Sequence, residues 1–64
     1  MSMDKNPSAD DRAKAARLFA EGQAAEAVRD YRRALDCYRR SLALVGDPAV
    51  GEALRNLMAL IGPM

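Results

Sequence analysis

The sequence has no histidine and no tryptophan, a single cysteine and only one phenylalanine. A lone cysteine cannot form a disulfide within the chain, and without histidine no zinc-binding cluster can be recognised. The same shortage leaves no convincing set of nucleophile, base and paired carboxylates, so we expect neither an enzyme nor a bound cofactor or metal. No apolar run approaches the roughly 20 residues that cross a bilayer. These absences are typical of a protein in the reducing cytoplasm.

Charge and length suggest what kind of partner the chain has. Ten lysines and arginines stand against nine aspartates and glutamates, so the net charge of +1 gives no general attraction for nucleic acid, which we do not expect as a partner. A chain this short buries only about 60% of its unfolded surface, and here no disulfide or metal compensates. We therefore expect association with another protein chain, and first of all a homodimer.

The helix signals in the first two thirds of the chain indicate a leader and two helices. Residues 1–7 show no periodicity and predict a disordered leader. Ser8 is a typical N-cap for a first helix at about residues 9–28, and Asp30 is one for a second helix at about 31–45. A single helix through both segments is the alternative. It would be unusually long and would leave two apolar faces uncovered, so we favour a turn.

The last third of the chain predicts a loop and a third helix. Gly46 is expected to be a left-handed residue that ends the second helix. Asp47 and Pro48 then supply an N-cap and a first-turn proline for a helix at about 48–61. Short loops between three helices imply antiparallel neighbours. The fold class predicted for residues 8–62 is therefore all-α, a three-helix antiparallel array.

The second predicted helix has an unusually wide apolar arc. Its apolar stripe consists of Tyr31, Ala34, Leu35, Tyr38, Ser41, Leu42 and Val45. Cys37 and Leu44 widen it to about half the circumference, more than one neighbouring helix covers. The helix is therefore expected to be central or to contact another chain, with Cys37 half-buried and not reactive. Arginines occupy the rest of the helix, and Arg29, Arg33 and Arg40 form a candidate surface for an acidic partner.

The first predicted helix carries a stripe of alanines with helical spacing. Its members are Ala9, Ala13, Ala16, Ala20, Ala24 and Ala27. A flat stripe of small residues lets another helix approach closely. Two interpretations follow, because the approaching helix can belong either to the same chain or to a second molecule.

Several residues of these helices together are similar to one tetratricopeptide repeat. They are Leu18, Gly22, Ala25, Asp30, Tyr31, Ala34, Tyr38, Ser41, Leu42, Leu44 and Pro48. The resemblance implies a helical hairpin in which Gly22 and Ala34 let the two helices approach, although Arg29 stands where the family usually has a glycine. The third helix looks like the first helix of a following repeat and would cap the hairpin, after a connection slightly longer than the family norm. The chain also resembles the microtubule-interacting-and-trafficking type of three-helix bundle, whose third helix is ordinarily longer.

The resemblance also implies a binding surface, because the first helix of each tetratricopeptide pair lines a concave groove. The matching positions are Phe19, Gln23 and Glu26, with Arg12 nearby. Phe19 has a second interpretation, as a core residue under the third helix. The predicted partner-binding residues are Arg12, Phe19, Gln23, Glu26, Cys37 and Leu44. We expect an adaptor that binds a partner helix or peptide and also itself. The alternatives are a docking or assembly domain of a larger multienzyme system and, less favoured, a nucleic-acid accessory protein.

Overall fold

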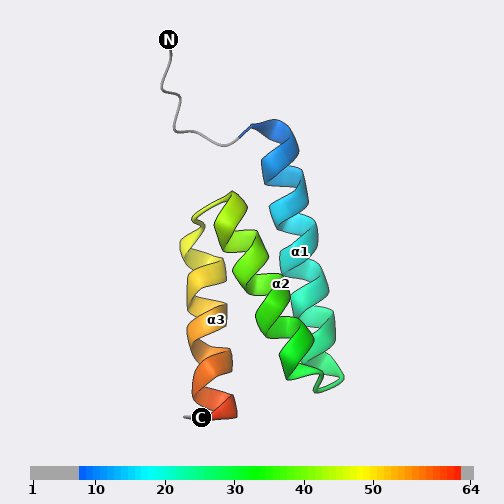
Figure 1. Ribbon diagram of the computed structural model, residues 1–64, viewed down its shortest axis with the longest axis vertical. Helices are drawn as coiled ribbons and strands as arrows, with labels where there is room; N and C mark the ends of the chain where they lie inside the picture. Colours follow the sequence, from blue (N-terminus) through cyan, green and yellow to red (C-terminus); the bar gives the residue numbers. More distant parts are fainter. Residues whose placement is uncertain (1–7, 63–64) are drawn as a thin grey trace.

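A computed structural model describes residues 8–62, which form three α-helices joined by two short loops (Figure 1). Helix α1 spans Ala9–Ala27, α2 spans Tyr31–Leu44 and α3 spans Pro48–Ile61. The predicted all-α, three-helix antiparallel fold is confirmed, although α1 and α2 each end one residue earlier than expected. The predicted leader, residues 1–7, lies outside the described residues.

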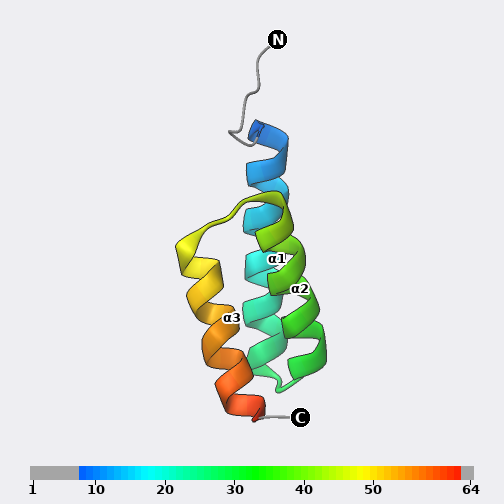
Figure 2. The same cartoon turned by 60° about the vertical axis from the view of Figure 1, so that its left-hand side comes forward.

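Helix α2 is the central element of the fold. It packs against both α1 and α3, whereas α1 and α3 barely touch each other. Figure 1 shows α2 between α1 and α3, and Figure 2, from another side, shows the start of α1 extending past the end of α2. The central position expected for the second helix is confirmed. None of these three helices combines the length and the apolar character that crossing a bilayer requires.

The core is small and is centred on Tyr38 of α2. The core cluster consists of Ala25, Ala34, Tyr38, Val50 and Leu57. Tyr38, Ala34 and Leu57 have no exposed surface. Gly22 of α1 lies directly against the Tyr38 ring, since a Cβ added to this glycine would stand 2.7 Å from the ring atom Cδ1. The close approach of α1 and α2 therefore depends on the missing side chain of Gly22.

The turn between α1 and α2 is built around Arg29, which has a left-handed backbone with a φ of 64°. The Asp30 N–H donates to the Ala25 carbonyl at 2.8 Å, and the Arg29 N–H donates to the Glu26 carbonyl at 2.9 Å. These two bonds are the Schellman pattern that ends many helices. The Asp30 carboxylate then accepts from the Arg33 N–H at 3.4 Å at the start of α2. The predicted turn is confirmed, and the single long helix is excluded.

Replacing Arg29 with glycine is expected to raise the free energy of unfolding by about 0.5–1 kcal/mol. The left-handed conformation costs a residue with a side chain about 1–2 kcal/mol of stability, and glycine removes this cost. The greater freedom of glycine in the unfolded chain offsets part of the gain. Urea denaturation followed by circular dichroism measures the change. The matched control is Arg39→Gly in the exposed middle of α2, which should lower stability by about 1 kcal/mol. A destabilised Arg29→Gly variant would contradict the left-handed turn.

The loop between α2 and α3 differs from the prediction at Gly46. Val45, the residue after α2, is extended, with φ −140° and ψ 123°. The Asp47 N–H donates to the Val45 carbonyl at 2.8 Å, so that Gly46 is the middle residue of a tight turn. Among the described residues Gly62 is the glycine with a positive φ, and the prediction of a left-handed Gly46 is wrong. The chain leaves α2 by straightening at Val45, while Asp47 caps α3 and Pro48 opens it, as predicted.

Candidate functional site

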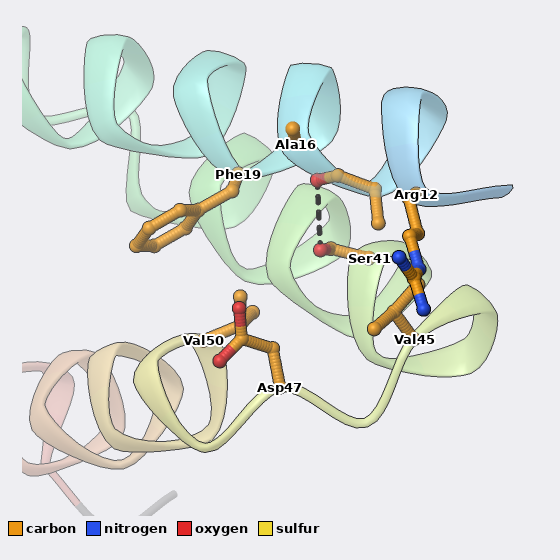
Figure 3. A pocket seen from close by; sticks show the side chains of 8 residues that line it. Arg12, Ala16, Phe19, Ser41, Val45, Asp47 and Val50 are labelled. Carbon is orange, nitrogen blue, oxygen red and sulfur yellow. Dashed lines mark hydrogen bonds between the residues drawn. The ribbon is translucent and has the colours of Figure 1, made fainter. Parts of the chain in front are cut away.

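A groove of about 320 Å³ opens between α1 and the start of α3, close to the end of α2 (Figure 3). Its lining residues are Arg12, Ala15, Ala16, Phe19, Ser41, Val45, Asp47 and Val50. Because α1 and α3 both pack on α2 but barely touch each other, the space between them stays open. The volume lies near the lower end of the range for ligand pockets. The groove is therefore large enough to hold a few side chains of another molecule.

Phe19 of α1 forms an aromatic wall of the groove. Its ring packs against the ring of Tyr38, with centroids 5.7 Å apart and planes tilted by 54°. Such tilted aromatic pairs are favourable beyond the area that they bury. Phe19 remains half-buried and faces the groove, which Val50 of α3 also lines (Figure 3). Both interpretations of Phe19 from the sequence thus describe part of its environment, because it belongs to the core packing and to the groove.

Ser41 fastens α1 to α2 at the bottom of the groove. It is fully buried, and its hydroxyl donates to the Ala15 carbonyl at 2.9 Å (Figure 3). The bond holds the two helices together at a level where both contribute small residues. Because its proton is already donated, Ser41 offers no free donor to a ligand. The bottom of the groove is therefore a packing surface.

Charged side chains of opposite sign stand at the margin of the groove. Arg12 of α1 and Asp47 at the start of α3 are both exposed. One oxygen of the Asp47 carboxylate accepts from the Ala49 N–H at 3.0 Å, which leaves the other oxygen available. Within residues 8–62 neither side chain is in an ion pair, and no group of three potential metal ligands occurs there. The groove thus offers a cation and a carboxylate to a ligand.

Glu26 makes a hydrogen bond to the core that the sequence did not predict. Its carboxylate accepts from the Tyr38 hydroxyl at 2.7 Å. Burial raises the pKa of Tyr38 well above its usual value, and the hydrogen bond to Glu26 raises it further. Tyr38 is therefore a neutral hydrogen-bond donor in the core, and its hydroxyl is bound by Glu26 of α1. Gln23 is exposed but does not line the groove, so the structure brings only Arg12 and Phe19 of the four predicted groove residues to this site.

Cys37 and Leu44 lie away from the groove. Cys37 is only 5% exposed, so the expectation of a half-buried thiol is wrong, and no partner can reach it on the surface. It lies one turn before Ser41, on the flank of α2 that faces α1, which explains its burial. Leu44 is half-buried. Neither residue lines the groove.

The alanine stripe of α1 faces solvent. All six of its members are exposed: Ala9, Ala13, Ala16, Ala20, Ala24 and Ala27. The interpretation that the stripe packs inside the monomer is therefore wrong. The buried small residues of α1 are Ala15, Gly22 and Ala25, which face α2 on a different side of the helix. Alanine is compatible with either face, so its spacing alone did not distinguish them.

The three arginines predicted to meet an acidic partner are exposed and lie outside the groove. They are Arg29, Arg33 and Arg40. Arg40 pairs with Asp36 at 3.3 Å, and both side chains are largely in solvent. An ion pair so exposed contributes little to stability. The structure therefore places this surface apart from the groove.

Comparison with known proteins does not place the chain in a family. No family model matches it, and neither a curated protein nor a solved structure gives a match.

Proposed function

We propose that the chain is an adaptor that binds a peptide or helix of a partner protein in the groove between α1 and α3. The observation that carries this proposal is an open, mostly apolar groove with an aromatic wall at Phe19. Partner helices and peptides are commonly held by a few apolar anchor side chains in such grooves. Arg12 and Asp47 at the margin would fix the direction of the bound segment through charge.

A tetratricopeptide-like hairpin is part of the proposal. It is supported by the contact between Gly22 and the Tyr38 ring and by the complete burial of Ala34, the two small residues that the resemblance assigns to the helix contact. Helix α3 would cap the hairpin. The microtubule-interacting-and-trafficking type of bundle is less well supported, because α3 and α2 have the same length of 14 residues. A docking domain of a multienzyme system would use the same groove for a helix of the neighbouring polypeptide.

Self-association is the second part of the proposal. Large apolar side chains remain in solvent, with Val28 74%, Met58 56% and Leu60 60% exposed. The half-buried Tyr31, Leu35, Leu42 and Leu44 add apolar surface on α2. Sedimentation equilibrium over a wide concentration range is expected to show a dimer. A monomer mass at every concentration would remove this part and leave the groove proposal intact.

The groove can be tested with peptides selected for binding to the purified protein from a random peptide library. Ala16 lines the groove and is exposed, so Ala16→Glu should obstruct the groove without disturbing the core. We expect fluorescence anisotropy to show a loss of affinity of about tenfold or more, which corresponds to about 1.4 kcal/mol. Ala16 is preferable to Phe19 for this purpose, because Phe19 also packs on Tyr38 and its removal would weaken the fold.

The matched control is Ala20→Glu, the same substitution on the same helix. Ala20 is exposed but does not line the groove. The affinity of this variant for the selected peptides should stay within about twofold of that of the unmodified protein. Equal affinities of the two variants would show that the peptides bind elsewhere. A library that yields no binding peptide would also count against the proposed groove.

A further inference from the structure

The sequence of α2 repeats itself after seven residues. Residues 31–35 read Tyr-Arg-Arg-Ala-Leu, and residues 38–42 read Tyr-Arg-Arg-Ser-Leu. In both copies the tyrosine, the small residue and the leucine are buried or half-buried, whereas both arginines are exposed. Seven residues of an α-helix span about 10 Å along its axis. Helix α2 therefore presents two arginine pairs about 10 Å apart on its outer side.

Positive charge is concentrated on this outer side of α2. The exposed residues of the helix are Arg32, Arg33, Asp36, Arg39, Arg40 and Ala43. Tyr31–Leu44 contains four arginines and one aspartate, a net charge of +3, while the whole chain carries +1, so the remaining residues carry −2. None of the exposed residues of α2 lines the groove. The chain thus has a second surface whose chemistry differs from that of the groove.

We propose that this arginine face, formed by Arg32, Arg33, Arg39 and Arg40, binds an acidic helix of a partner protein. Asp36 and Ala43 lie seven residues apart along the middle of the face, with arginines on both sides. Each of the two is three or four residues from a neighbouring arginine, which is the spacing of side chains that share one face of a helix. A helix that runs beside α2 with two carboxylates in every seven residues would meet both arginine pairs. Guanidinium groups bind carboxylates through two parallel hydrogen bonds. The small side chain of Ala43 lets the partner backbone come close.

Asp36 favours a protein helix over nucleic acid as the ligand. Its carboxylate lies between the arginine pairs, 3.3 Å from Nε of Arg40, where it would repel a phosphate backbone. None of the six exposed residues of α2 is aromatic, so none can stack on a base. The Arg40 and Asp36 side chains are 68% and 60% exposed, so Arg40 can exchange this internal pair for a partner carboxylate at little cost.

The test uses the full chain and two synthetic alanine-based helical peptides with the same number of glutamates. One peptide carries a glutamate pair in every seven residues, and in the other the pairs recur every five residues and point in different directions. We expect the heptad peptide to bind about tenfold more tightly by fluorescence anisotropy, and its affinity to fall as salt increases. Replacing Arg32, Arg33 and Arg39 with glutamine should weaken this binding about tenfold and leave the Arg40 to Asp36 pair in place.

A control variant removes the same charge from other helices. Lys14, Arg17 and Arg55 are exposed on α1 and α3, and their replacement with glutamine should change the affinity by no more than about twofold. Equal losses in the two variants, or equal binding of the two peptides, would show only general charge attraction and would overturn the proposal. Tighter binding of a single-stranded or duplex oligonucleotide than of the heptad peptide would overturn it in favour of nucleic acid. The Ala16→Glu variant should keep its affinity for the heptad peptide. A loss of this affinity would show that the peptide binds in the groove and not on a separate arginine face.

Discussion

Leu57→Ala is expected to lower the free energy of unfolding by about 2–5 kcal/mol, the usual cost of emptying a fully buried leucine site. Leu57 has no exposed surface and belongs to the core cluster together with Tyr38 and Val50. A domain of this length has a total stability of roughly 3–10 kcal/mol, so the substitution removes a large share of it. Because α3 packs mainly against α2, the loss of the Leu57 side chain also weakens the packing of α3, the helix that carries Val50. Thermal and urea denaturation followed by circular dichroism measure the effect.

The matched control for Leu57 lies on the same helix. Leu60 is 60% exposed, so Leu60→Ala removes the same atoms from a site that is mostly in solvent. Its effect should stay within about 0.5 kcal/mol. If the two variants were equally destabilised, α3 would not present the face to α2 that the structure shows. The wall that Val50 contributes to the groove would then also be misplaced.

The helix boundaries could be predicted because their signals are local. Ser8, Asp30 and Asp47 each cap a helix through their own side chains, accepting a backbone N–H two or three residues later. The sequence signal for the turn at Arg29 is weaker than the capping signals, since a glycine normally takes the left-handed position that Arg29 occupies here. The prediction of a left-handed Gly46 is wrong for the opposite reason. A glycine after a helix permits a positive φ but does not require one, and the extended Val45 had already turned the chain.

The groove could be predicted only in part. The resemblance to a tetratricopeptide repeat indicates Arg12 and Phe19, because it assigns the groove to the first helix. It does not indicate Val45, Asp47 and Val50, because these residues come from the following loop and helix. Helical periodicity shows which side of a helix is apolar, but it does not show how far two helices stand apart on a third. That separation depends on the packing of buried side chains, and no short sequence signal reports it.

Gly22→Ala is expected to lower the free energy of unfolding by about 2 kcal/mol, although alanine is the better helix former by about 1 kcal/mol. The new methyl group would meet the Tyr38 ring, with Cδ1 at 2.7 Å and Cζ at 3.2 Å. The ring cannot move aside easily, since it is fully buried and its hydroxyl is bound to Glu26. Helix α1 would have to shift away from α2. That shift would strain the bond from Ser41 to the Ala15 carbonyl at the bottom of the groove.

Gly51→Ala is the matched control, because Gly51 lies inside α3 and a Cβ there would meet nothing within 4 Å. This variant should be stabilised by about 0.5–1 kcal/mol, so the same substitution is expected to have opposite signs at the two glycines. A double-mutant cycle identifies the cause. In a Tyr38→Leu background the ring atoms that obstruct the methyl group are gone, and Gly22→Ala should then cost about 1 kcal/mol less than in the unmodified protein. An unchanged cost would mean that Gly22 is required for some reason other than the close approach of Tyr38.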